Sequence, residues 1–283
     1  MNIQDIPHLQ RSIRQALNED VGNGDHSALS CIPSTHEGGA KLLIKEPGVL
    51  AGVELAKMVL HEVDESIEVE VLIEDGSPVK PGDIVFIAKG KTIALLQAER
   101  LLLNYMQRLS GVATKTAHYM KLVEGTKAKV LDTRKTTPGL RYLEKWAVAQ
   151  GGGYNHRIGL FDMIMLKDNH IDFAGGIPQA VERAVNYLKE TDIQIPIEVE
   201  TRNMEEVEQA LNSPGVDRIM LDNFTPAQTV EAVKYINGRV EVESSGGITE
   251  ETIRDYAECG VDFISVGALT HSVSGLDMSF KAL

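Results

Sequence analysis

The chain has 283 residues, a formal net charge of −13 and a hydrophobic fraction of 43%. Its length allows one large domain or two modest ones, and two cysteines alone exclude a disulfide scaffold and any cysteine-rich metal site. No apolar run is long enough to span a bilayer, and the acidic total disfavours nucleic acid as the main partner. The first twenty residues contain Asp5, Glu19 and Asp20 and lack the apolar core of a signal peptide, so we expect a cytoplasmic protein.

The first part of the chain mixes helical and strand patterns. Residues 7–22 have apolar side chains at helical spacing. Short strand patterns that end in Gly or Pro-Gly turns occupy residues 39–97, and a helical pattern over residues 53–63 interrupts them. Residues 92–123 read as one long helix or two, with Gly111 as the main breaker. We therefore predict an α+β, sandwich-like N-terminal domain over residues 1–110.

The second part alternates short strands with helices. Six β-rich runs, VLDTRK, MIMLKDN, IPIEVE, RIMLDN, VEVESSGG and FISVGA, are mostly separated by helical stretches. Such alternation is typical of βαβ units and a parallel sheet. Short strands that are each followed by a helix favour a β/α barrel over an open sheet. We predict a barrel domain over residues 111–283, incomplete because only six or seven strands can be assigned.

The charge is uneven along the chain. Residues 111–167 carry 10 basic and 4 acidic side chains, a net of +6 inside an acidic protein. A solvated basic face would explain this block. An anionic ligand also explains it, because Arg and Lys are the natural partners of carboxylates and phosphates.

Polar and charged residues follow the predicted strands. The carboxyl ends of barrel strands meet at one mouth, where active sites lie, and charges held there cost free energy unless they are paired. A ring of them on successive strands therefore favours a functional site over simple capping. The ring comprises Asp132, Arg134, Lys135, Lys167, Asp168, Asn169, Glu200, Asp222, Asn223, Ser244, Ser245 and Gly267.

Two late turns and two basic segments point to anions. The run from Ser244 through Ser245, Gly246 and Gly247 precedes a helix, and Gly267-Ala268 opens the next one, so backbone N–H groups at both turns can approach a phosphate. Arg134 and Lys135 follow the first barrel strand, and His156-Arg157 follows three glycines. Arg binds carboxylates bidentately. Glu200 and Asp222, on neighbouring strands, can hold Mg²⁺, bind ribose hydroxyls or stabilise a developing cation.

The motif series resembles that of the quinolinate phosphoribosyltransferase family. The matching segments are EDVGNGD, ERLLLNYMQRLSGVAT, DTRKTTPGLR, GGGYNHRIGLFDMIMLKDNH, EVE, LDNF, ESSGGI and SVGALTHS, in order over nearly the whole chain. One local departure is DHSA after EDVGNG, where the family more often reads DxT. Ser27 keeps the hydroxyl at that position.

The resemblance implies a phosphoribosyl transfer in NAD biosynthesis. Quinolinate would attack phosphoribosyl pyrophosphate with its ring nitrogen, and pyrophosphate and CO₂ would leave nicotinate mononucleotide. Lys135, Lys167, Glu200 and Asp222 would be catalytic, with Mg²⁺ as cofactor held by Glu200 and Asp222. The substrate-binding set would be Arg100, Arg134, Lys135, His156, Arg157, Lys167, Glu200, Asp222, Ser244, Ser245, Gly246, Gly247, Gly267, Ala268 and His271.

The resemblance also implies a homodimer in which Arg100 reaches the barrel of the other subunit. Two alternatives remain open at this point. Lys167 at a strand end would suit a Schiff-base aldolase, although that reading leaves the Arg134 and Arg157 cluster without a shared purpose. A non-catalytic anion-binding relative on the same scaffold is the other.

Overall fold

The computed structural model describes residues 3–283, which divide into two compact units. Unit 1 comprises Met1–Ala117, Thr137–Gly152 and Ser272–Leu283, and unit 2 comprises His118–Thr136 and Gly153–His271. The chain therefore passes between the units four times, whereas the sequence pattern divides it once, after residue 110. Local periodicity reports helices and strands, but it does not report which unit a short returning segment joins.

Unit 1 is built on an antiparallel sheet with the order β12-β1-β5-β3. The C-terminal strand β12 pairs with β1 so that Phe280 lies opposite Leu42, and the Phe280 ring packs 6.0 Å from that of Phe86. Strand β2 pairs with β4 in a separate two-stranded sheet. The strand bounds are Glu37–Ile44 for β1, Gly48–Val49 for β2, Glu68–Val71 for β3, Pro78–Val79 for β4, Ile84–Lys91 for β5 and Met278–Ala282 for β12.

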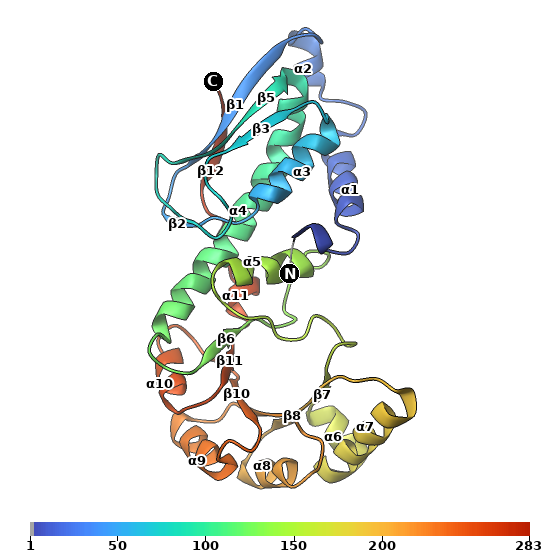
Figure 1. The fold of residues 1–283 in the computed structure, drawn as a ribbon, viewed down its shortest axis with the longest axis vertical. Coiled ribbons are helices and arrows are strands. Elements are labelled where there is room, and N and C mark those ends of the chain that lie inside the picture. Colours follow the sequence, from blue (N-terminus) through green and yellow to red (C-terminus); the bar gives the residue numbers. More distant parts are fainter. Residues whose placement is uncertain (1–2) are drawn as a thin grey trace. The chain divides into compact units, whose positions relative to one another are not determined.

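The helices α1 and α3 and the first part of α4 lie on one side of this sheet (Figure 1). Their apolar faces are buried, for example Ile13 of α1 and Leu55 of α3, as helical periodicity predicts. Arg14 of α1 forms a 2.7 Å ion pair with Glu62 of α3. The helical bounds are Ile3–Asp5 for the 3₁₀ turn η1, Leu9–Val21 for α1, His26–Cys31 for α2, Val53–Val63 for α3, Thr92–Leu122 for α4 and Arg141–Gln150 for α5.

The region predicted as one helix or two is the single helix α4, and Gly111 does not break it. Gly111 instead allows another segment of the chain to pack closely against the helix. A Cβ atom built on Gly111 would overlap the carbonyl oxygen of Ser274 and would lie 2.9 Å from Cγ1 of Val273. The missing side chain thus lets the segment before β12 pass against the helix.

Unit 2 is an incomplete β/α barrel, as predicted. Its six parallel strands have the order β6-β11-β10-β9-β8-β7, with β6 and β7 at the two edges. All six strand runs read from the sequence are confirmed. Their bounds are Lys129–Leu131 for β6, Ile164–Leu166 for β7, Ile197–Thr201 for β8, Arg218–Asp222 for β9, Glu241–Ser245 for β10 and Phe263–Ser265 for β11.

The helices between Asp168 and Glu258 follow the strands and cover the outer face of the sheet (Figure 1). Their starts follow local chemistry, since Asn203 caps α8 and Thr225 caps α9 by accepting a backbone N–H bond at its third residue. None of the described helices is long and apolar enough to cross a membrane. The bounds are Asp168–Ala174 for α6, Ile177–Thr191 for α7, Met204–Leu211 for α8, Pro226–Ile236 for α9, Ile253–Glu258 for α10 and Ala268–His271 for α11.

The packing at Gly111 predicts the sign of a substitution. In an unconstrained helix, Gly→Ala stabilises by about 1 kcal/mol. Here we expect Gly111→Ala to lower the free energy of unfolding by ~1–3 kcal/mol, because the methyl group would overlap the Ser274 carbonyl. Thermal unfolding measures the change, and Asn104→Ala, at an exposed position of the same helix, should have little effect. A Gly111→Ala protein that is as stable as wild type, or more so, would contradict this packing.

Candidate active site

Strand geometry in unit 2 places polar side chains inside the sheet. Successive side chains of a strand alternate between its faces. In β8, Val199 faces the helices while Glu198 and Glu200 face inward, and in β9 Met220 and Asp222 take the inward positions. The parallel register sets these inward residues side by side, since Glu200 pairs with Met220, and Met220 with Glu243.

The inward residues line a cavity of about 830 Å³ that belongs entirely to unit 2. This volume is in the range of small-molecule sites. The lining comprises Thr133, Arg134, Lys135, His156, Arg157, Met165, Lys167, Glu200, Met220, Asp222, Asn223, Glu243, Ser245, Gly246, Gly247, Ile248, Thr249, Ser265, Gly267, Ala268 and His271.

Four cationic side chains line this cavity: Arg134, Lys135, Arg157 and Lys167. Arg157 is almost fully buried, and its Nη1 donates to the carbonyl oxygen of Met163 at 3.2 Å. Burial, and then repulsion by the charge of Arg134, lower the pKa of Arg157. An anion between them would relieve this repulsion, and the arrangement therefore favours an anionic ligand.

Two carboxylates face the cations. Glu200 Oε2 lies 3.0 Å from Nζ of Lys167, and Asp222 accepts a 2.8 Å bond from the side chain of Asn223. Burial, and then the charge of Glu200, raise the pKa of Asp222. The two acids predicted to act as a pair are thus close enough to repel one another, and a cation or a set of hydroxyl groups between them would be stabilised.

A glycine turn completes one wall. Gly246 has a φ of 95°, and a Cβ built on it would overlap Oδ1 of Asn223 and lie 2.9 Å from the Asn223 backbone nitrogen. Asn223 itself is in the left-handed region, and its N–H donates to the carbonyl of Ser245 at 2.9 Å. Only glycine fits this close approach of two strand-end loops. The turn leaves Gly247 exposed beside the cavity, in the position expected of a phosphate-binding loop.

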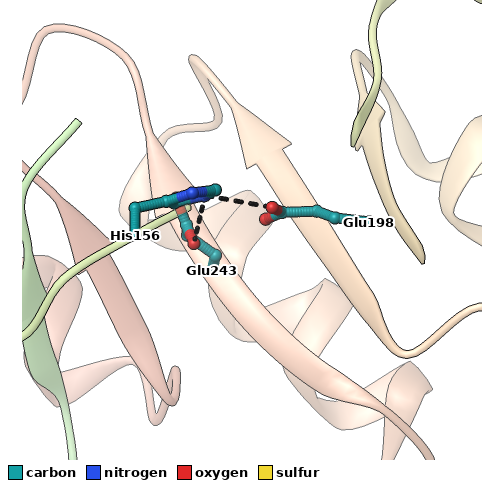
Figure 2. Close-up of side chains that lie close together, drawn as sticks. All are labelled: His156, Glu198 and Glu243. Carbon is teal, nitrogen blue, oxygen red and sulfur yellow. Dashed lines mark ion pairs between the residues drawn. The ribbon is translucent and has the colours of Figure 1, made fainter. Parts of the chain in front are cut away.

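A buried charge cluster adjoins the cavity, and two of its three members, His156 and Glu243, are part of the lining. The Nε2 atom of His156 is 3.0 Å from Oε2 of Glu198 and 3.5 Å from Oε2 of Glu243 (Figure 2). Burial raises the pKa of Glu198 to about 7 and that of Glu243 to about 8, and the charge of Glu198 adds to the rise at Glu243. The two carboxyl groups therefore retain a proton between them at neutral pH.

The same three residues have the composition of a metal site, with ligand atoms within 4.8 Å of one another. The charges around them favour a different role. Nη1 of Arg218 lies 3.1 Å from Oε2 of Glu243, and the charges of Arg157 and Lys167 also act on Glu198. Because fixed cations already balance the carboxylates, we interpret the cluster as an ion-pair network.

The structure brings together most of the residues singled out in the sequence. Of the predicted substrate-binding set, all line the cavity except Ser244 and Arg100. Ser244 is buried on the opposite face of β10, because it is one residue out of phase with Glu243 and Ser245. Arg100 is an exposed residue of α4 in unit 1.

Several cavity residues were not predicted, notably Met165, Met220, Glu243 and Ser265. The alternation of side chains along a strand indicates two of them, since Glu243 and Met220 each stand two positions before a predicted strand-end residue and so share its face.

Of the other strand-end residues, Asp132 is fully buried and accepts the backbone N–H of His156 at 2.9 Å. It therefore supports the loop that carries His156.

The buried carboxyl pair predicts a pH dependence of stability. A carboxyl group whose pKa is raised in the folded state contributes stability that is present below its unfolded pKa, about 4.5, and lost as pH rises through its folded value, here about 7 to 8. A protein with Glu198→Gln and Glu243→Gln lacks this loss. Its unfolding midpoint, relative to wild type, should therefore rise between pH 5 and pH 8.5 in thermal unfolding.

The matched control is Glu205→Gln at an exposed position of α8, whose difference from wild type should not change with pH. If the double variant also differs from wild type by a constant amount across this range, the carboxyl pair is ionised throughout and our description of the cluster is wrong.

Comparison with known proteins gives one consistent family. Models of the N-terminal and C-terminal domains of quinolinate phosphoribosyl transferase match residues 25–110 and 112–281. The chloroplastic nicotinate-nucleotide pyrophosphorylase [carboxylating] of Arabidopsis thaliana is 46% identical over 96% of this chain and 82% of its own length. A probable nicotinate-nucleotide pyrophosphorylase [carboxylating] of Bacillus subtilis is 40% identical over 96% of this chain and 93% of its own.

Solved structures agree with these relatives. The crystal structure of NadC from Streptococcus pyogenes matches with a TM-score of 0.93 and 39% identity, and the match covers 99% of both chains. A nicotinate-nucleotide pyrophosphorylase from Francisella tularensis matches with a TM-score of 0.91 and 38% identity over 100% of this chain and 99% of that one. The two domain models and the full-length relatives together show that this chain belongs to the quinolinate phosphoribosyltransferase family.

Proposed function

We propose that this chain transfers the phosphoribosyl group of phosphoribosyl pyrophosphate to quinolinate, with loss of CO₂, to give nicotinate mononucleotide and pyrophosphate. The single observation that carries the proposal is the cavity of unit 2, in which four cationic side chains face two carboxylates beside a glycine turn. Two polyanionic substrates need such cations, and a ribosyl cation needs such carboxylates.

The cations would bind the anionic groups of both substrates. Arg134 and Arg157 suit the two carboxylates of quinolinate, since a guanidinium group binds a carboxylate through two parallel bonds. Lys135 and Lys167 would stabilise the charge that develops on the leaving pyrophosphate. The turn at Gly246 and Gly247, together with the start of α11 at Ala268, would hold the 5′-phosphate.

The carboxylates would act on the ribose. As the bond from C1′ to pyrophosphate breaks, the ring gains oxocarbenium character, which Glu200 and Asp222 can offset electrostatically. The quinolinate nitrogen then forms the new bond to C1′. The positive charge of the resulting pyridinium nitrogen stabilises the electron pair that departing CO₂ leaves on C2, and a proton from water then takes the place of the carboxylate on that carbon.

Magnesium fits the same two acids. Mg²⁺ is usually held by one or two carboxylates together with substrate phosphates and water, and Glu200 and Asp222 lie close enough for each to feel the other's charge. When bound, the ion would neutralise part of the pyrophosphate charge.

The cytoplasmic location expected from the sequence stays a prediction.

Lys167 does not suit the Schiff-base alternative. An aldolase lysine needs a free Nζ to attack a carbonyl carbon, whereas Nζ of Lys167 is held 3.0 Å from the carboxylate of Glu200. A non-catalytic anion-binding relative is distinguished by assay. Purified protein with quinolinate, phosphoribosyl pyrophosphate and Mg²⁺ should form nicotinate mononucleotide, and a protein that binds both substrates without product would contradict the proposal.

The two guanidinium groups predict discrimination between substrates. Nicotinate has one carboxylate fewer than quinolinate, so it would leave one arginine of the cavity unpaired. An unpaired buried charge costs ~3–5 kcal/mol, which corresponds to at least two decades in kcat/KM. Steady-state assays with both pyridine acids measure the ratio, and comparable turnover of nicotinate would contradict the role given to Arg134 and Arg157.

The paired acids predict a split between kinetic constants. Glu200→Gln and Asp222→Asn keep size and remove charge, so each should lower kcat more than it raises KM for quinolinate, because the lost interaction is with the ribosyl cation. The matched control is Glu205→Gln, an exposed acid on α8. Normal turnover by both variants would mean that these carboxylates serve the barrel's architecture.

We further propose a homodimer in which Arg100 of each subunit completes the site of the other. Support comes from the exposed position of Arg100 on α4 and from the absence of any unit 1 residue in the described cavity lining. A twofold interface is reciprocal, so each subunit would lend its arginine to its partner. Arg100→Ala and Lys167→Ala homodimers should each be nearly inactive.

Mixing the two variants by joint unfolding and refolding tests this sharing. About half of the dimers would be mixed, and each mixed dimer would have one site with both defects and one intact site. Activity should therefore recover to roughly a quarter of wild type if the sites act independently. No recovery, with mixed dimers verified by mass spectrometry, would mean that Arg100 is not shared.

A further inference from the structure

The ring of His156 lies between the backbone of Arg157 and two buried carboxyl groups. Nδ1 accepts the backbone N–H of Arg157 at 2.7 Å. Nε2 faces Oε2 of Glu198 at 3.0 Å and Oε2 of Glu243 at 3.5 Å (Figure 2). A ring nitrogen that accepts an N–H bond carries no proton itself, so the proton of the neutral ring is on Nε2, the nitrogen that lies beside the two carboxyl groups.

The two carboxyl groups beside Nε2 are buried on strands of the same sheet. Glu243 is fully buried, and its Oε2 accepts from Nη1 of Arg218 at 3.1 Å. The Arg218 guanidinium stacks 4.0 Å from the centre of the Phe263 ring. Glu198 is also fully buried on the neighbouring strand β8. Neither carboxyl group can turn to water, so each keeps an acceptor oxygen toward the histidine.

The loop on the other side of the ring carries Arg157. The backbone N–H of His156 donates to Asp132 at 2.9 Å, and Nη1 of Arg157 donates to the carbonyl oxygen of Met163 at 3.2 Å. The bond from the Arg157 N–H to the His156 ring fixes the backbone between these two anchors. The direction of the Arg157 guanidinium, which lines the cavity, therefore depends on the ring.

We propose that His156 is a positioning residue. It acts through Nδ1 on the backbone of Arg157, Glu198 and Glu243 hold its tautomer, and the anionic ligand is bound by the Arg157 guanidinium instead of by the imidazole. For its ligand, quinolinate, this inference rests on the proposed function. It replaces the expectation, implied by the family resemblance, that His156 belongs to the substrate-binding set.

Two substitutions of His156 test the roles of its two ring nitrogens separately. The side-chain oxygen of Asn can take the place of Nδ1, and the amide of Gln can take the place of Nε2. We expect His156→Asn to bind quinolinate within about threefold of wild type, and His156→Gln to bind it about tenfold more weakly, the effect of one lost hydrogen bond. Isothermal titration of the three proteins measures this, and equal affinities in both variants, or the reverse order, would overturn the proposal.

A second measurement needs no ligand. The Arg157 amide should be protected from hydrogen exchange in wild type and in His156→Asn, and should exchange faster in His156→Gln. If wild type does not bind quinolinate at all, the proposed function is wrong, and the exchange of this amide still tests the inference. An Arg157 amide that exchanges equally in all three proteins would overturn it.

The tautomer can be read directly in case a variant fails to fold. Nitrogen-15 spectra of the wild-type ring should show a protonated Nε2 and a bare Nδ1, both unchanged when saturating quinolinate is added. A ring that gains a second proton, or shifts its proton to Nδ1, when quinolinate binds would show a direct contact with the substrate and would overturn the proposal.

Discussion

The constraint on which this structure depends is the pairing of charges inside the sheet of unit 2. A buried carboxylate costs several kcal/mol unless a fixed cation and hydrogen bonds compensate it. Glu198 and Glu243 are fully buried, and Arg218, His156 and a retained proton supply their compensation. The six short strands therefore have to hold their register closely, because a shift of one residue would turn every one of these groups to the outer, apolar face.

Alternation along the same strands links this network to the cavity. On β8 the inward residue after Glu198 is Glu200, and on β10 the inward residue after Glu243 is Ser245. The charges of Glu198 and Glu243, which lie earlier on their strands, are thus balanced inside the protein. Toward the carboxyl ends of the strands, Lys167 and the loops that carry the arginines face the cavity. Four cationic side chains face the cavity where a ligand can reach them, and this gives the cavity its preference for anions.

Much of this arrangement could be predicted from the sequence. The six barrel strands and most of the cavity residues follow from period-two and helical patterns and from charges at strand ends, and the motif series resembles one family. The returning segments at residues 137–152 and 272–283 could not be predicted, because membership of a unit depends on contacts distant in sequence. Gly111 reads as a breaker, yet it permits contact with Ser274. Charges at strand ends indicate only the last inward residue of each strand, whereas Glu198 and Glu243 lie two positions earlier on the same face.

The most direct test of the cavity as an anion site is a crystal structure of the protein with quinolinate bound. We expect one carboxylate within hydrogen-bonding distance, about 2.7–3.2 Å, of the Arg157 guanidinium, the other beside Arg134, and the ring nitrogen toward Glu200 and Asp222. Quinolinate bound outside the unit 2 cavity, or bound inside it with both carboxylates away from the arginines, would contradict the account.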